Sequence, residues 1–214
     1  GISSERKSYL PTEIKNDAGD VIIDKPMVLE EWRKAFEKIY ASDMDSTDFD
    51  QQHLNYVTSS NTEPANKNDD QAILNEPISK KEVREAILRA KIRKAAGVDT
   101  IKAEVLKNEV CINLLHKICN RCFQSGQVPA SWNQSIINPI PKESRKDPLI
   151  PGNYRGIALL SVPCKIYCDI LNKRLSKWLE DHSKVADEQN GYRKDRSCVD
   201  HLYVLNSIID KRIK

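Results

Sequence analysis

The 214-residue sequence predicts an α+β fold that is mostly helical and contains a small antiparallel sheet. Apolar residues recur at spacings of three and four in several segments, which is typical of helices that cover a core. Two apolar runs, residues 135–141 and 154–160, are predicted to be strands and follow one another in the chain. Because helices flank these strands rather than alternate with them, the order of elements indicates an α+β organisation.

Residues 1–42 are predicted to form an ordered lead-in with one amphipathic helix. The stretch "DAGDVIID" indicates a turn followed by a brief strand. Trp32, Phe36 and Tyr40 then recur every four residues, so a helix over roughly residues 28–41 has an aromatic face.

Residues 43–76 are polar and acidic and show no sustained periodicity, which predicts a flexible linker. Residues 1–76 contain 8 Lys and Arg against 16 Asp and Glu, whereas residues 77–214 contain 26 against 15. We call residues 1–76 the acidic front and residues 77–214 the basic body. This charge distribution is expected of a protein whose basic body binds a polyanion, although lysine and arginine are also ordinary solvated surface residues.

The basic body begins with predicted helices. The capping box "SKKE" at Ser79 precedes a helical apolar stripe. The stretch "AAGVD" predicts that this helix breaks at Gly97 and that another begins near Asp99 or Thr100. A longer helix over roughly residues 110–125 ends at "SGQVP", because glycine and proline there prevent continuation.

The two predicted strands enclose a polar connection. The strand at 135–141 contains Pro139 and Pro141, which lack a ladder N–H, so we expect it at the margin of a sheet. The connection to the second strand, of about eleven residues, is long enough for a functional loop. Pairing of the strands would bring Lys142 and Arg155, which bracket the connection, close together. Two such cations can clamp a phosphate chain, or they can be ordinary surface charges.

Two further helices and a polar segment complete the body. Ser161 can cap a helix whose apolar stripe continues to Leu179. Residues 188–197 form a polar, basic segment with one aromatic side chain, and Ser197 with Asp200 caps a last helix. The apolar face of that helix consists of Cys198, Leu202, Leu205 and Ile209.

The spacing of His116, Cys119 and Cys122 allows a zinc site, but an apolar helix face explains the two cysteines better. Free cysteines behave there as small hydrophobic residues. The sequence shows neither a secretory leader nor an apolar run long enough to span a membrane. We therefore expect an intracellular, reducing location, in the nucleus or the cytoplasm, with no membrane partner.

The motifs of several enzyme classes do not occur in the sequence. It contains no G-x-x-x-x-G-K-[ST] phosphate loop and no G-x-S-x-G elbow. The four histidines are scattered, and no carboxylate pair lies at the end of a predicted strand. We therefore assign no catalytic and no metal-binding residue within the chain.

Several stretches of the sequence resemble motifs of one known protein family, and they occur in the same order as in that family. "IINPIPK" and "NYRGIALLS" contain the predicted strands, and "KIRKAAGVDTIKAEVLK", "GQVPASW", "KIYCDILNKRLSKWL" and "DEQNGYRKDRSCVDHLYVL" stand around them. The first two resemble the first two fingers motifs of reverse transcriptases from non-LTR, LINE-type retrotransposons. The other four resemble, in turn, the family's lysine-rich segment, its lead-in to the first fingers strand, the helix after the second strand and the template-side motif that follows. "VIIDKPMVLEEWRKAFEKIY" resembles the segment that these proteins carry between endonuclease and polymerase. Val98 and Thr100 stand where the family usually has Pro and Gly, Gly156 where Pro is common, and Asp195 where Gly is common.

The resemblance implies that residues 77–214 form an incomplete fingers region of a right-hand polymerase. Lys142 and Arg155 match the residues that bind the triphosphate of an incoming dNTP. The residues that match the template-binding stretch are Gly191, Tyr192, Arg193, Lys194 and Arg196. Glycine there would let the backbone approach the nucleic acid, and the tyrosine would support a base or simply pack.

The resemblance also implies what the complete polymerase needs. Polymerisation uses Mg²⁺ held by palm carboxylates, and the only Asp-Asp pair here, Asp69-Asp70, precedes the fingers motifs. The chain ends at Lys214, about where the first palm strand would begin, so we expect no nucleotide incorporation by these residues alone. The expected partners are an RNA template, a DNA primer, a dNTP, and the missing palm and thumb. The alternatives are a non-enzymatic nucleic-acid-binding protein derived from the element and a helical protein-interaction module.

Overall fold

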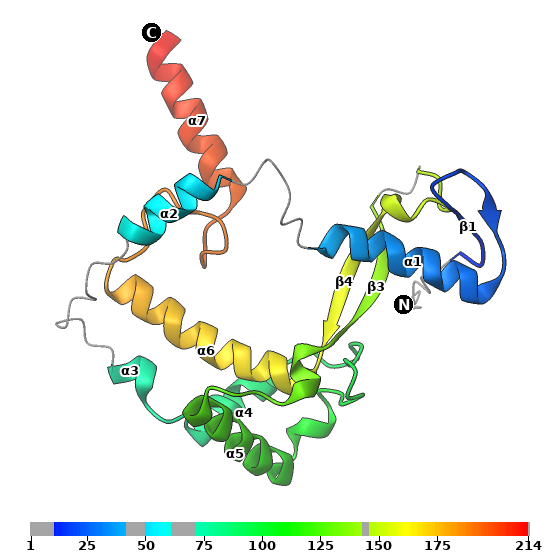
Figure 1. The fold of residues 1–214 in the computed structure, drawn as a ribbon. Coiled ribbons are helices and arrows are strands. Elements are labelled where there is room, and N and C mark those ends of the chain that lie inside the picture. Colours follow the sequence, from blue (N-terminus) through cyan, green and yellow to red (C-terminus); the bar gives the residue numbers. More distant parts are fainter. Residues whose placement is uncertain (1–10, 42–49, 61–71, 143–145, 214) are drawn as a thin grey trace, which may run out of the picture.

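The computed structural model describes residues 11–41, 50–60, 72–142 and 146–213. They form helices together with two separate two-stranded antiparallel sheets, which confirms the predicted α+β class (Figure 1). The helices are α1 (Lys25–Tyr40), α2 (Gln51–Ser60), α3 (Ala72–Asn75), α4 (Lys80–Arg89), α5 (Glu109–Ser125), α6 (Val162–Asp181) and α7 (Cys198–Ile213). The strands are β1 (Ile14–Lys15), β2 (Val21–Ile22), β3 (Ser135–Pro141) and β4 (Tyr154–Leu160). Short 3-10 turns are η1 (Val105–Lys107), η2 (Ala130–Asn133) and η3 (Pro151–Asn153).

Helices α4, α5 and α6 enclose the larger hydrophobic core. Each presents an apolar stripe, represented by Ile87 of α4, Cys119 of α5 and Ile170 of α6, which are all almost fully buried. Burial of an aliphatic side chain such as that of Ile87 or Ile170 contributes about 1.5–3 kcal/mol. Cys119 and Cys122 both belong to this core, which confirms that they lie on an apolar helix face.

The predicted capping box begins α4. The Ser79 hydroxyl oxygen accepts a hydrogen bond from the Glu82 N–H (3.3 Å), and the Glu82 carboxylate accepts one from the Ser79 N–H (2.8 Å). The buried Arg174 of α6 donates to both Glu82 oxygens, at 2.6 and 2.9 Å. The start of α4 is therefore attached to the middle of α6.

The segment after α4 differs from the prediction. The helix ends well before Gly97, and residues 90–104, all of which are described, contain no further helix near Asp99 or Thr100. The Asp99 carboxylate instead accepts hydrogen bonds from the Ile101 N–H (3.1 Å) and the Ser161 hydroxyl (2.6 Å), and Thr100 has a positive φ of 58°. These contacts hold the segment in a turn, so the prediction of a helix there is wrong.

Gly97 is needed for close packing rather than for a helix break. A Cβ atom at this position would collide with the backbone of Leu160 and Ser161. The absence of a side chain lets the segment lie against the point where β4 passes into α6.

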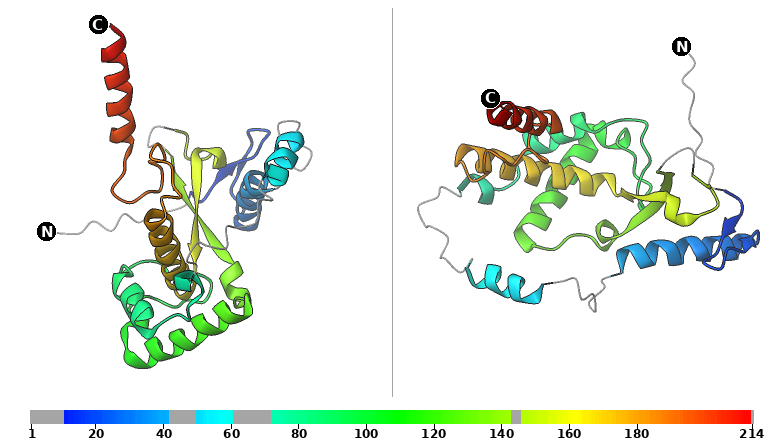
Figure 2. Two further views of the ribbon diagram at one scale, coloured as in Figure 1. Left: turned by 90° about the vertical axis from the view of Figure 1, so that its left-hand side faces the viewer. Right: turned by 90° about the horizontal axis from the view of Figure 1, so that it is seen from above.

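Strands β3 and β4 form the predicted antiparallel pair, which extends away from the α4–α6 helices (Figures 1 and 2). Ile140 lies opposite Arg155, and Pro139 lies opposite Gly156. Among the described residues this sheet consists of β3 and β4 alone, so both prolines of β3 lie in an edge strand, as predicted.

Helix α1 covers one face of the β3–β4 hairpin, and the predicted aromatic stripe makes the contact (Figure 2). Trp32 packs edge-on against Tyr154, with ring centroids 4.9 Å apart. The Tyr40 hydroxyl donates to the carbonyl of Gly156 (3.2 Å). Helix α1 and the β3–β4 hairpin therefore share a second, smaller hydrophobic core.

The segment predicted as a flexible linker is described in part. Helix α2 and the short α3 lie within it, so that part is helical, whereas residues 42–49 and 61–71 lie outside the described residues. The pair Asp69-Asp70 also falls there. The linker assignment itself remains a prediction.

The last predicted helix, α7, is present and begins with the expected cap, where the Ser197 N–H donates to the Asp200 carboxylate (2.6 Å). Its predicted apolar face is exposed, and α7 projects away from the other helices (Figures 1 and 2). Among the described residues, none on α7 is buried.

Candidate nucleic-acid interface

The register of the hairpin places Lys142 and Arg155 on the same face. Side chains of directly opposite residues share a face, and so do residues two positions apart along a strand. Ile140 faces Arg155, and Lys142 continues the pairing because its N–H donates to the Asn153 carbonyl (2.8 Å). The two cations are therefore diagonal neighbours on the face that points away from α1.

Both side chains are exposed, and no ion pair involves either of them within the described residues. The Lys142 ammonium donates to the Gly152 carbonyl oxygen (2.9 Å), which orients it over the connection between the strands. Three exposed isoleucines share this face of the hairpin: Ile136, Ile140 and Ile157. The face can therefore meet an anion and an apolar group side by side.

The N-terminal strand β1 holds the connection between β3 and β4 in place. The Lys15 N–H donates to the Leu149 carbonyl (2.8 Å), and the Lys15 ammonium pairs with Asp147 (2.7 Å). This ion pair holds the pKa of the Asp147 carboxyl below its usual value. The Tyr154 hydroxyl donates to the Pro148 carbonyl (2.9 Å). Residues 143–145 lie outside the described part.

The segment predicted to contact the template follows α6. Tyr192 has a positive φ of 59°, and its side chain is fully exposed, so packing, one of the two roles considered for it, does not occur in this structure. Asp195, at a position where the family commonly has glycine, also has a positive φ of 59°. The turn therefore keeps a glycine-like conformation, and it presents an aromatic ring to solvent.

The three cations of this segment differ in how they are engaged. The Arg193 guanidinium binds both oxygens of Glu180, at 2.8 and 2.9 Å, and its side chain is only 14% exposed. This pairing raises the pKa of Arg193 and lowers that of Glu180. Lys194 and Arg196 make only long ion pairs, at 3.7 Å to Asp195 and 3.9 Å to Asp187. In this structure Arg193 ties the segment to α6, which the sequence did not indicate.

A hollow of about 720 Å³ separates this segment from α6. Its lining includes Gly191, Tyr192 and Lys194 on one side and Lys173 and Lys177 of α6 on the other. A groove with cations and one exposed aromatic ring is the arrangement that accepts a single nucleic-acid strand.

The structure does not bring the two predicted sets of site residues together. The hairpin leads into the first turn of α6, whereas residues 191–196 follow its last turn (Figure 1). A helix of 20 residues is about 30 Å long, so α6 lies between the two sets.

The residues that allowed a zinc site are otherwise engaged. His116 contacts the Ile78 carbonyl oxygen (2.9 Å), and Cys119 and Cys122 lie in the core. Burial raises the pKa of the Cys119 thiol to about 12. Within the described ranges no group of three or more His, Cys, Asp or Glu side chains could hold a metal ion.

The chain is similar to two proteins of Drosophila melanogaster. It is 27% identical over 135 residues, 62% of its length, to a protein named as a probable RNA-directed DNA polymerase from transposon BS. It is 31% identical over 124 residues, 57% of its length, to a 115 kDa protein in the type-1 retrotransposable element R1DM. The chain is related to retrotransposon proteins.

This relationship confirms the resemblance to retrotransposon reverse transcriptases that the motifs indicate. The matched stretches cover only 15% and 12% of the two relatives, so the chain spans a small part of their length. No protein-family model matches the chain. No helix in the described ranges has both the length and the apolar character needed to cross a membrane.

Proposed function

We propose that the chain is the fingers part of an RNA-directed DNA polymerase of a non-LTR, LINE-type retrotransposon. In this proposal Lys142 and Arg155 bind the triphosphate of an incoming dNTP. Gly191, Tyr192, Lys194 and Arg196 contact the template strand, and Arg193 positions them. The proposal includes an intracellular location, in the nucleus or the cytoplasm.

The observation that carries the proposal is the register of the β3–β4 hairpin. It supports a clamp because the two cations share one exposed face, free of ion pairs among the described residues. An Arg fork and a Lys ammonium side by side match the oxygens of a phosphate chain in geometry and charge. The name of one relative, an RNA-directed DNA polymerase, supports the substrate class.

The clamp is tested by titrating the whole chain with a deoxynucleoside triphosphate. We expect Arg155→Ala and Lys142→Ala each to raise the Kd about five- to tenfold, because each removes a charge-assisted contact worth about 1 kcal/mol at an exposed site. Affinity for single-stranded RNA should change far less.

The matched control for this titration is Lys38→Ala, which removes an exposed lysine at the end of α1. Equal effects of all three substitutions would show that only net charge matters and would reject the clamp.

The proposal also states that these 214 residues incorporate no nucleotide by themselves. Mg²⁺-dependent extension of a DNA primer on an RNA template by the purified chain would contradict it. A complete reverse transcriptase in a parallel reaction verifies the assay.

A protein-interaction role is the second candidate, and one observation favours it. Helix α7 exposes large apolar side chains along its length, including Leu202, Leu205 and Ile208, each more than half exposed. Nucleic-acid binding that falls steeply with salt supports the polymerase proposal, because phosphate contacts release counterions. Little RNA or DNA binding even at low salt would favour the interaction module.

A further inference from the structure

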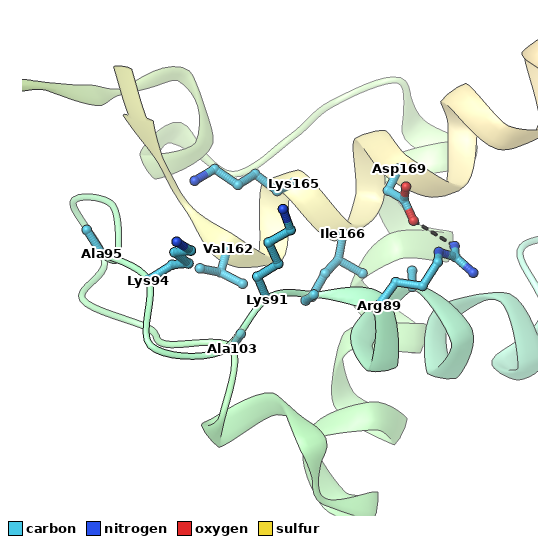
Figure 3. A pocket seen from close by; sticks show the side chains of 11 residues that line it. Arg89, Lys91, Lys94, Ala95, Ala103, Val162, Lys165, Ile166 and Asp169 are labelled. Carbon is cyan, nitrogen blue, oxygen red and sulfur yellow. Dashed lines mark hydrogen bonds and ion pairs between the residues drawn. The ribbon is translucent and has the colours of Figure 1, made fainter. Parts of the chain in front are cut away.

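A second hollow lies beside α6, between its first turns and the segment that follows α4 (Figure 3). Its volume is about 350 Å³. Alanines and the aliphatic Val162 and Ile166 form its floor, and Lys91, Lys94 and Lys165 stand around it.

The three lysines are exposed, and their ammonium groups have no hydrogen bond or ion pair among the described residues. In Figure 3 the side chains of the three lysines stand around the hollow, while Arg89 turns aside to Asp169. Arg89 and Asp169 form an ion pair of 2.7 Å, so the one acid of this pocket is already neutralised. Like charges held together without a counter-charge repel, and an anion in the pocket would remove this cost.

The hollow lined by Lys91, Lys94 and Lys165, here called the lysine pocket, adjoins the hollow beside residues 191–194, and we call the two together the trough along α6. Arg89 and Asp169 line both of them. The lining residues of α6 in the two hollows lie three or four positions apart, so they form one face of the helix. They include Val162 and Lys165 near the start of α6, Asp169 in its middle, and Lys173, Lys177 and Glu180 toward its end.

The cations along this trough differ in how strongly they are already neutralised. Lys173 pairs with Glu85 (3.1 Å) and Lys177 with Asp181 (2.9 Å). The uncompensated positive charge of α6 and its surroundings therefore lies at the other end, around Lys165. From Lys165 to Lys177 the helix rises about 18 Å, enough for several nucleotides of an extended strand.

We propose that Lys91, Lys94 and Lys165 bind a phosphodiester group of a single nucleic-acid strand that continues along α6 to Tyr192. This inference rests on the proposed function and adds an anchor that lies apart from both predicted sets of site residues. Lysine suits a phosphate as a compact charge with three donors, and the apolar floor accommodates a sugar or base. The contacts would bind RNA without sequence preference, because they reach the backbone rather than base edges.

The test measures binding of the whole chain to a fluorescent single-stranded RNA of about 16 nucleotides over about 50–200 mM salt. The cluster variant carries Lys91→Ala, Lys94→Ala and Lys165→Ala together. We expect its affinity at the lowest salt to fall about tenfold or more, and its salt slope to fall by about 0.7, since that is the contribution of one neutralised single-strand phosphate.

A matched triple variant controls for net charge. It carries Lys38→Ala, Lys107→Ala and Lys117→Ala, which remove the same charge from exposed lysines without an ion pair among the described residues, scattered over α1, η1 and α5. We expect its affinity and slope to stay close to those of the unmodified chain. Equal losses in the two triple variants would overturn the inference.

A second measurement avoids any effect of substitution on folding. Acetylation of the unmodified chain, read by mass spectrometry, reports the access of reagent to each lysine. Bound RNA should shield Lys91, Lys94 and Lys165 and leave Lys34 reactive. Unchanged reactivity of the three pocket lysines under saturating RNA would overturn the inference.

Two competitors distinguish the sources of negative charge. If tripolyphosphate shields the three lysines at a lower concentration of negative charges than RNA does, the pocket is a site for a free phosphate chain. If polyglutamate shields them as strongly as RNA does, the pocket is a surface for an acidic protein. Either result rejects the nucleic-acid assignment.

The outcomes separate this inference from the proposed function. If RNA binds with a normal salt slope but the cluster variant behaves like the scattered one, only the lysine pocket is wrong. If the unmodified chain binds no RNA, both are wrong.

Discussion

Arg174 of α6 and Glu82 of α4 form a charged pair that joins two helices of the larger core. The guanidinium of Arg174 binds both Glu82 oxygens and also donates to the carbonyls of Glu76 (2.5 Å) and Pro77 (3.1 Å). Its position over the Phe123 ring, with 5.7 Å to the centroid, adds a cation–π contact. One side chain of α6 therefore fixes the start of α4 and the backbone that precedes it.

This pair makes stability depend on pH. The Arg174 hydrogen bonds, followed in effect by those from Ser79, lower the pKa of Glu82 to about 2 from 4.5. A carboxyl whose pKa is lowered by folding stabilises the protein above its unfolded pKa, and this stabilisation is lost as the pH falls through the folded pKa. The contribution is therefore complete near neutral pH and declines between about pH 4.5 and 2.

Glu82→Gln tests this contribution, because glutamine keeps a capping group at the same position but carries no charge. We expect the free energy of unfolding at pH 7 to fall by about 2 kcal/mol, after allowance for partial exposure of the carboxylate. The difference from the unmodified chain should shrink as the pH falls from about 5 toward 2. Urea unfolding followed by circular dichroism across this range measures both effects.

Glu85→Gln is the matched control, since Glu85 pairs with Lys173 on the surface at 3.1 Å. Exposed pairs contribute about 0–1 kcal/mol, so its loss should be small. A Glu82→Gln loss no larger than this control would refute the structural role of the buried pair.

At the scale of elements, the contact between α1 and the hairpin decides which face of β3–β4 is free. The aromatic residues Trp32, Phe36 and Tyr40 occupy the face that carries Tyr154 and Gly156. The opposite face, with Lys142 and Arg155, is thereby left open to a ligand.

Gly156 permits this docking, and its replacement should loosen α1. A Cβ there would lie 2.8 Å from Phe36 Cε1 and from the Tyr40 hydroxyl, and 2.9 Å from Ile137 Cγ2. We expect Gly156→Ala to destabilise the protein by about 1–3 kcal/mol and to speed amide exchange in α1. Hydrogen exchange followed by mass spectrometry measures the change for each helix.

Gly152→Ala provides the comparison, because a Cβ at that position lies 3.9 Å from its nearest neighbour, Ile150 Cγ2. It should leave α1 exchange unchanged. Equal exchange in the Gly156 and Gly152 variants would mean that α1 does not depend on the close approach.

At the scale of the whole molecule, two hydrophobic cores of unequal size hold the described residues. The α4–α6 core is the larger, and the core under α1 has five buried members: Ile14, Val28, Trp32, Phe36 and Tyr154. Regions with fewer buried apolar contacts open at lower free energy. The hairpin with α1 should therefore open locally while the α4–α6 core stays folded.

We expect native-state hydrogen exchange to show this order directly. Amides of α5 and α6 should be the most protected, those of α1 should exchange at an intermediate rate, and those of the exposed α7 should exchange fastest. Mass spectrometry of peptic fragments after timed exchange gives the three rates. Protection of α1 equal to that of α5 would contradict the two-core description.

Much of the local structure was predictable from the sequence. The capping signal at Ser79, the aromatic spacing on α1 and the strand runs at 135–141 and 154–160 all reappear at nearly the expected positions. Each of these features acts over a few neighbouring residues, so a short window of sequence contains its whole cause.

The candidate site was predictable only in part. The sequence indicated the neighbouring positions of Lys142 and Arg155, because strand pairing follows from adjacent strands. It did not indicate that Glu180 engages Arg193 or that Lys165 joins Lys91 and Lys94 at one pocket. Those groupings join residues from separate elements, and no periodicity in one element reports them.

The sequence by itself determined the start of α4, the aromatic stripe of α1, the β3–β4 strand pair, the charge difference between residues 1–76 and 77–214, and the relationship to retrotransposon proteins. Only the tertiary structure decided the turn at Asp99, the face of the hairpin that α1 covers, and the trough along α6. The physical reason is that contacts such as Arg174 with Glu82, 92 residues apart, depend on how whole elements pack. Local propensity does not contain that information.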